Sequence, residues 1–178
     1  RVDPYGGAIV GLGVLDDVVI VFKETAIYAF GGPGPAAAPA LDPQSGFSPP
    51  QLVTSDCGCK AADSIGITPD GLIFQSEKGI MLLDRTRQLQ RIGTPVTAYN
   101  AQTVTRTVLR PDRPYVLLTS ADAGARALLY DYERAQWSTF TNHIGIDAAV
   151  VGGSLYYLRT DSRVFKETIG SYADDGLH

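Results

Sequence analysis

The sequence contains no run of lysine and arginine, although 15 of its 178 residues are basic. With 19 acidic residues its formal net charge is −4, which excludes nucleic-acid binding through a basic surface. No apolar stretch reaches the roughly 20 residues that a membrane-spanning helix needs. Residues 1–4 lack the charged start and apolar run of a signal peptide, and the first residue is not methionine. We therefore expect a globular chain without membrane contact, processed or cut from a longer polypeptide.

Cysteine and histidine are too scarce for a disulfide framework or an obvious metal centre. The two cysteines, Cys57 and Cys59, flank a single glycine, and a disulfide across one residue is strained. As zinc ligands they would need two further donors, and His143 and His178 lie far away in the sequence. We expect two reduced, structural thiols in a turn between repeats, and we expect neither a metal nor a cofactor.

No catalytic signature occurs in the chain. It lacks the phosphate-binding P-loop, the His-Glu-x-x-His zinc motif and the Gly-x-Ser-x-Gly nucleophile turn. His143 has no acid, serine or cysteine at motif spacing. The acid pairs Asp16-Asp17 and Asp174-Asp175 stand where turns are expected, and aspartate favours turns for backbone reasons. An enzyme would need convergent acids, and three acids inside the repeats are the ones to check for it: Asp84, Asp131 and Asp161. We expect no catalytic residue and no enzyme.

What the sequence does contain is clearest in residues 64–93. Four short segments rich in isoleucine, leucine and phenylalanine are separated there by tight polar connections. Asp70-Gly71 predicts a two-residue hairpin of type I′, Lys78-Gly79 predicts a weaker one, and residues 86–88 form a polar connection. The pattern predicts four antiparallel strands and no helix. Such a meander must stack on copies of itself, as a propeller blade does; one sheet of a β-sandwich is the alternative.

The same unit of three or four strands recurs about four times, starting near residues 8, 64, 103 and 147. This spacing fits propeller blades, whose repeats are about 40–50 residues long. We therefore predict an all-β fold of antiparallel four-stranded meanders, arranged as a β-propeller or part of one, in a single domain over residues 1–178. Four blades are few for a closed ring. Either the chain is part of a larger wheel, or an N-terminal strand pairs into the last blade and closes it.

Two further features have a structural and a functional interpretation. Residues 31–50 are rich in proline and glycine and predict a long loop, either flexible or in contact with a partner. Trp137 and four tyrosines could line a sugar-binding surface, but aromatics at strand spacing more often pack between blades. The four tyrosines are Tyr130, Tyr132, Tyr156 and Tyr157.

Several stretches resemble the virion structural proteins of tailed bacteriophages, particularly the β-propeller portion of tail nozzle or tail-stabilisation proteins. They are GLGVLDDVVIVFKETAIYAF, SDCGCKAADSIGITPDGLIFQSEKGIMLLDR, RIGTPVTAYN and LLYDYERAQWSTFTN, with the closing FKETIGSYADDG. The resemblance covers residues 11–172 and includes the Ser-Asp-x-Gly-Cys element, in which Cys57 takes the variable position. These are scaffold motifs and not catalytic ones.

The resemblance implies a structural component of a phage tail, made in the host cytoplasm and located in the virion. It implies a homo-oligomeric ring that contacts other tail, adaptor or portal proteins and lets DNA pass without sequence-specific binding. An acidic chain suits such a duct, because lysine and arginine would hold the phosphates. Two other functions remain: a propeller binding module for a protein or a glycan, and a propeller glycosidase or lyase.

Overall fold

A computed structural model describes residues 5–32 and 48–167, which form fifteen strands in four antiparallel sheets. We call the sheets blades 1 to 4. Blade 1 contains β1 (Ile9–Leu15), β2 (Val18–Lys23), β3 (Ile27–Gly31) and β4 (Gln51–Thr54). Blade 2 contains β5 (Gly66–Thr68), β6 (Gly71–Ser76), β7 (Gly79–Asp84) and β8 (Leu89–Arg91). Blade 3 contains β9 (Val104–Leu109), β10 (Tyr115–Ser120), β11 (Ala127–Asp131) and β12 (Gln136–Phe140). Blade 4 contains β13 (Asp147–Val151), β14 (Ser154–Leu158) and β15 (Val164–Lys166).

The connections between blades are short, and two of them contain a 3₁₀ helix. The helix η1 (Ala62–Ser64) precedes blade 2, and η2 (Thr94–Tyr99) leads into blade 3. No described helix is long and apolar enough to cross a membrane. The predicted loop of residues 31–50 lies mostly outside the described residues, as do Asp174, Asp175 and His178.

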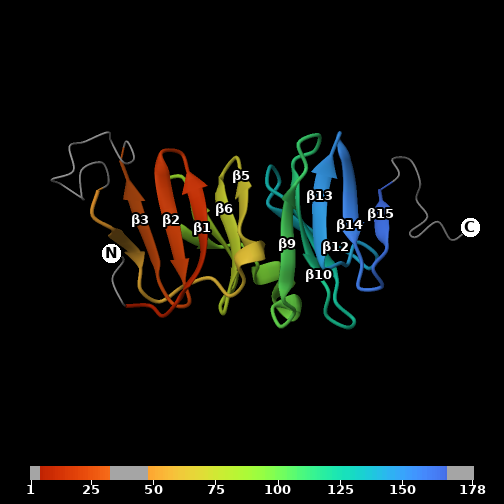
Figure 1. Ribbon diagram of the computed structural model, residues 1–178, viewed down its shortest axis with the longest axis horizontal. Coiled ribbons are helices and arrows are strands. Elements are labelled where there is room, and N and C mark those ends of the chain that lie inside the picture. The colour runs from red at the N-terminus through yellow and green to blue at the C-terminus, as the bar shows by residue number, and fades with distance from the viewer. Residues whose placement is uncertain (1–4, 33–47, 168–178) are drawn as a thin grey trace, which may run out of the picture.

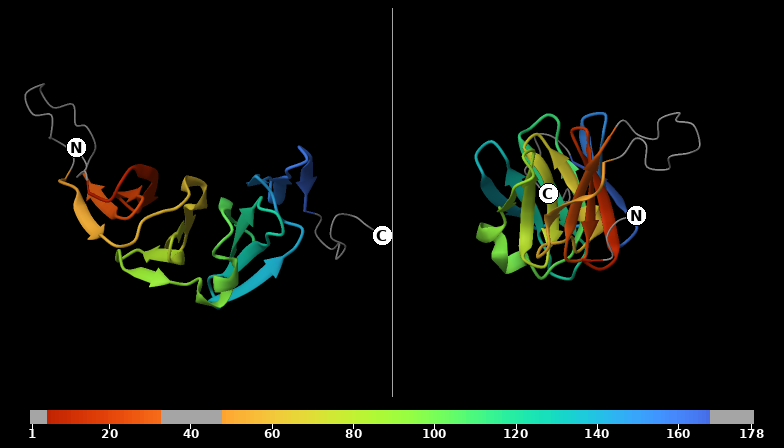
Figure 2. Two further views of the ribbon diagram at one scale, coloured as in Figure 1. Left: turned by 90° about the horizontal axis from the view of Figure 1, so that it is seen from below. Right: turned by 90° about the vertical axis from the view of Figure 1, so that its left-hand side faces the viewer.

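The blades stand side by side in chain order (Figure 1) and follow an arc whose two ends do not meet (Figure 2). The first strands of successive blades contact one another, β1 with β5, β5 with β9 and β9 with β13, on the concave side of the arc. The predicted all-β, propeller-like fold is confirmed. Closure through an N-terminal strand in the last blade is wrong for the described residues, because β1 pairs with β2 at the opposite end of the arc.

The hairpin predicted at Asp70-Gly71 exists, but its turn is shifted by one residue. Thr68 pairs with Gly71, so Pro69 and Asp70 are the two loop residues. Proline is favoured at the second position of a type I turn and glycine at the fourth, which explains the shift. Gly71 has φ +150°, and a Cβ there would collide with the carbonyl oxygen of Leu83. The next hairpin repeats the arrangement, with Gly79 at φ +109° after its two loop residues.

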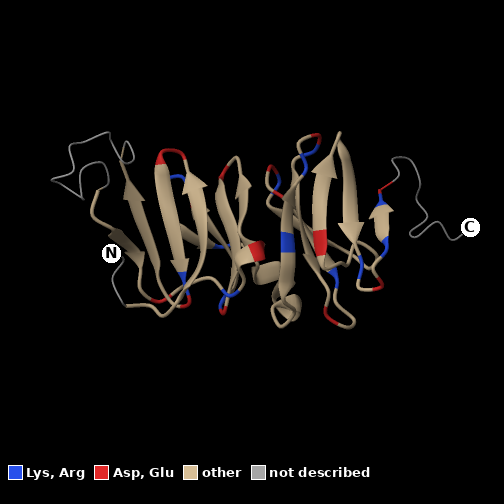
Figure 3. Cartoon of the chain, viewed as in Figure 1, with Lys and Arg blue, Asp and Glu red and all other residues tan. Residues whose placement is uncertain are grey.

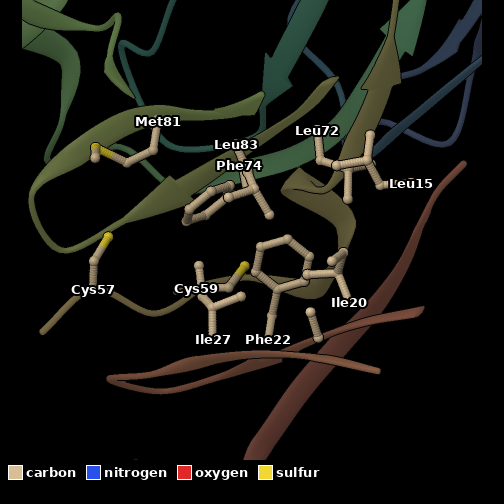
Figure 4. Packing of buried hydrophobic residues seen from close by; sticks show 11 residues of the cluster. Leu15, Ile20, Phe22, Ile27, Cys57, Cys59, Leu72, Phe74, Met81 and Leu83 are labelled. Atoms are coloured by element: carbon tan, nitrogen blue, oxygen red, sulfur yellow. The ribbon is translucent and has the colours of Figure 1, made fainter. Parts of the chain in front are cut away.

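The core is divided among the joints between neighbouring blades. Strand alternation directs Phe22 of blade 1 and Phe74 of blade 2 toward each other, with ring centroids 4.8 Å apart (Figure 4). A second apolar cluster lies between blades 2 and 3, and a third between blades 3 and 4. In blade 2 both faces are covered, and every residue of β6 is buried. Stability in such an arrangement is shared between neighbouring repeats.

Candidate assembly faces

Buried polar side chains connect blade 2 to blade 3 across their joint. Gln75, which is fully buried, donates from Nε2 to the carbonyl oxygen of Gln102 at 2.6 Å. Its Oε1 accepts the backbone N–H of Val104 at 2.9 Å. Gln102 continues the chain of contacts, because its side chain accepts the N–H of Arg126 and donates to the carbonyl of the same residue. These amides replace the backbone hydrogen bonds that two separate sheets cannot form with each other.

An ionic cluster at the joint of blades 3 and 4 was not predicted from the sequence. Arg110 is 1% exposed and pairs with Asp112 at 3.1 Å and with Glu167, which follows β15. Burial alone would lower the pKa of Arg110, but the hydrogen bonds to Asp112 and Glu167 raise it overall, so the guanidinium stays charged. The same bond lowers the pKa of Asp112. His143 lies between the rings of Phe140 and Tyr157, with Nε2 3.9 Å from Glu167.

A second charged contact runs along the concave side, between first strands and their neighbours. Arg106 on β9 pairs with Asp147 on β13 at 2.8 Å and with Asp63 of η1 at 3.4 Å. Figure 3 shows basic and acidic segments next to one another in the middle of the molecule, and the two ion pairs join the connection before blade 2 to the first strands of blades 3 and 4. All three side chains are partly exposed, and such surface pairs contribute little to stability.

The outer face of blade 1 is apolar on all four strands. Register places Leu12, Val21, Tyr28 and Leu52 in one cross-strand row, and Val14, Val19 and Phe30 in the next. Val21 and Tyr28 at its centre are buried, whereas Leu12 is 64% exposed and Val14 is 58% exposed on the first strand. Leu52, on the last strand, is exposed as well. The exposed apolar side chains of this face therefore lie on its first and last strands, while its centre is covered.

The outer face of blade 4 mixes exposed apolar residues with charged ones, Asp147 on β13 and Lys166 on β15. Its outward residues on β13 are Asp147, Ala149 and Val151, and the last of these is 63% exposed. Tyr156 and Leu158 point the same way from β14, and Val164, which pairs with Leu158, is 66% exposed on β15. Each of the two described ends of the arc therefore presents exposed valine or leucine where an interior blade has a neighbour.

The three acids named as tests for an enzyme lie in three different blades and each belongs to its own turn. Asp84 accepts the N–H groups of Thr86 and Gln88 together with the Thr86 hydroxyl, and the hydroxyl is the main cause of its lowered pKa. Asp131 pairs with Arg134 at 2.8 Å, which lowers the pKa of the aspartate. Asp161 is held by Arg163 in the same way, at 2.5 Å. The described residues bring no two of these carboxylates together in one site.

The remaining candidates also have structural partners. Asp16 forms an ion pair with Arg85 of blade 2, across the first joint. Trp137 packs on Tyr130 with centroids 4.8 Å apart and donates from its indole to the carbonyl of Ile92. Tyr157 packs between blades 3 and 4, and Tyr156 points outward beneath Lys166. Tyr132 packs in the same cluster as Tyr130 and Trp137. The predicted packing role is therefore confirmed for these aromatic residues and for Tyr157, but not for Tyr156.

The two cysteines lie in the joint between blades 1 and 2. Both are reduced and buried, and burial raises the pKa of each thiol (Figure 4). Cys59 Sγ contacts the carbonyl of Ala61 at 3.1 Å. Among the described residues no group of three or more acids, cysteines or histidines is arranged to hold a metal ion. The prediction of structural thiols between repeats is confirmed for both residues.

No family model matches the sequence, and no curated protein matches it. Among solved structures, the computationally designed Ika4 protein is similar over 96% of this chain and 96% of its own length, with 14% identity and a TM-score of 0.53. PorZ, an essential surface component of the type-IX secretion system of Porphyromonas gingivalis, is 13% identical with a TM-score of 0.43. That match covers 90% of this chain but only 27% of PorZ. The Ika4 likeness concerns the fold alone.

Proposed function

We propose that this chain is a structural component of a bacteriophage tail and acts by assembly, not by catalysis. The observation that supports assembly is the open arc with exposed valine or leucine side chains on the outer face of the blade at each described end. A chain that functioned as a monomer would be more soluble with polar residues at these positions. The virion assignment has a different support, the resemblance of residues 11–172 to tail nozzle and tail-stabilisation proteins.

The two alternative functions have less support among the described residues. A glycan-binding module needs exposed aromatic rings, but Tyr130 and Tyr157 are buried in joints. A glycosidase needs two carboxyl groups within about 10 Å of each other on either side of a bond. Asp84, Asp131 and Asp161 are instead held by neighbours in separate turns. The proposed structural role needs a contact surface and a rigid fold, and a row of hydrogen-bonded sheets supplies both.

Immunogold electron microscopy with antibodies raised against the chain tests the virion assignment. Particles purified from the phage that encodes the sequence should carry gold at the tail and none at the capsid. A parallel mass-spectrometric inventory of the same particles should contain peptides of the chain. Particles without label and without peptides would refute the assignment, even if the protein assembles by itself.

A further inference from the structure

We propose that protonation of His143 stabilises the joint between blades 3 and 4, which makes this joint a pH-sensitive contact within the fold. The inference goes beyond the proposed action by assembly and does not depend on the virion assignment. An ordinary imidazole changes its charge between about pH 5 and about pH 8. His143 is the only histidine among the described residues, so the other two described joints contain none.

The segment that carries His143 connects blade 3 to blade 4 and is hydrogen-bonded to both. The N–H of Gly145 donates to the carbonyl oxygen of Ser120 in blade 3 at 3.0 Å. The N–H of Ile146 donates to the carbonyl oxygen of Leu158 in blade 4 at 2.8 Å. The side chain of His143 is only 13% exposed. The imidazole therefore lies inside the joint, where a change in its charge acts on both blades.

Three groups around the imidazole favour its charged form. Its Nε2 lies 3.9 Å from Oε1 of Glu167, which follows β15. The centroid of its ring lies 5.0 Å from that of Phe140 on β12 and 5.3 Å from that of Tyr157 on β14. A cation within about 6 Å of an aromatic centroid is attracted by the ring, and a carboxylate at such a distance attracts it as well. Because these groups belong to blade 3 and to blade 4, protonation strengthens contacts on both sides of the joint.

The negative charge of Glu167 is only partly balanced by Arg110. One guanidinium nitrogen, Nη1, donates to Oε2 of Glu167, whereas Nε and Nη2 donate to Asp112 at 3.1 and 3.2 Å. The neighbouring arginine, Arg113, contacts Asp112 at 3.5 Å. The other oxygen of Glu167, Oε1, is the one that faces His143. A protonated imidazole thus completes the ionic cluster of this joint.

Two effects oppose protonation, and the geometry limits both. Arg110 is a cation close to the same carboxylate, but two carboxylates share its charge. Burial disfavours a charged imidazole, but the side chains of His143 and Glu167 both retain contact with solvent. Other charged or titratable side chains near this joint have partners of their own. They are Tyr115 with Arg110 and Arg113, Asp147 with Arg106, Arg159 and Arg163 with Phe165, Asp161 with Arg163, and Lys166 with Tyr156.

Thermal unfolding of the 178-residue chain at two pH values tests the proposal. A histidine that gains partners when charged contributes stability that is fully present below the ordinary histidine pKa of about 6.5 and is lost as the pH rises through the neutral range. The Tm at about pH 5.5 minus the Tm at about pH 8 should therefore be about 3 °C more positive for the wild-type chain than for His143→Gln. His178→Gln is the matched control, because it removes the other histidine of the chain and should keep the wild-type difference.

Glu167→Gln tests whether the carboxylate is the partner. This variant keeps the shape of the side chain but removes its charge, so it should reduce the Tm difference although His143 is unchanged. Nuclear magnetic resonance of the wild-type chain gives a readout that needs no folded variant at the joint. The ring signals of His143, assigned by comparison with His178→Gln, should titrate at a higher pH in the folded chain than in the chain unfolded by urea.

Each measurement has a result that would overturn the proposal. A Tm difference that is the same in His143→Gln as in the wild-type chain would show that this imidazole does not stabilise the joint. A difference that persists in full in Glu167→Gln would show that the ionic cluster does not hold the proton. Ring signals of His143 that titrate at the same or a lower pH in the folded chain would contradict the sign of the effect. Because none of these measurements uses virions or assembled particles, they fail or succeed separately from the gold labelling.

Discussion

Replacing Gln75 by methionine should destabilise the fold far more than the loss of one surface amide would. Methionine fills similar volume, but it cannot accept the N–H of Val104 or donate to the carbonyl of Gln102. Both backbone groups would remain in a fully buried environment. An unsatisfied buried group costs about 1–3 kcal/mol, so we expect a loss of about 3 kcal/mol in the free energy of unfolding.

Thermal unfolding followed by circular dichroism measures this loss. For a chain of 178 residues each kcal/mol shifts Tm by about 2–4 °C, so the expected fall is about 9 °C. Gln136→Met is the control, because Gln136 lies exposed on β12 and its change should stay within about 0.5 kcal/mol. A fall of less than about 2 °C for Gln75→Met, or an equal fall in the control, would refute the bridging role of the amide.

Three further outcomes test other parts of the fold. Gly71→Val should cost about 2–3 kcal/mol in urea unfolding, because φ +150° and the backbone collision both oppose a β-branched residue. Asp112, whose pKa is lowered by Arg110, adds stability that is present above its unfolded pKa near 3.8 and lost as pH falls through the lower folded value. Asp112→Asn should therefore flatten the acid side of a Tm–pH profile. Cys57 and Cys59 should react slowly with a thiol reagent until denaturant is added, because both are buried with raised pKa values.

Strand positions could be predicted from the sequence because they depend on local pattern. The four strands predicted in residues 64–93 correspond to β5, β6, β7 and β8. The apolar run of β2 is buried on both faces from Ile20 onward. The exact loop residues of a turn could be predicted less well than the strands. Pro69 competes with Gly71 for the loop, and the preference of proline for the second turn position decides it.

Contacts between distant residues could not be predicted from one sequence. Arg110 and Glu167 are 57 residues apart, and no spacing rule connects them. Arg110 and Asp112 are two residues apart, but nothing in the local sequence indicates that the guanidinium is buried. The same holds for Gln75, a polar residue in an apolar strand. Its partners are backbone groups of blade 3, and backbone groups leave no signature in a sequence.

The outer face of the last described blade can be compared with an interior blade by its alternation of apolar and polar residues. A strand with one face in water alternates apolar and polar residues, but β13 reads Asp-Ala-Ala-Val-Val, with Val151 on the outward side. The interior strand β6 lacks polar alternation because both its faces are covered by neighbouring blades. Of the outward residues of β13, Asp147 is charged, whereas Ala149 and Val151 are apolar although no described blade covers them. Blade 4 therefore has a mixed outer face: Asp147 and Lys166 supply the polar groups that a terminal repeat needs, and Val151 and Val164 are exposed among them.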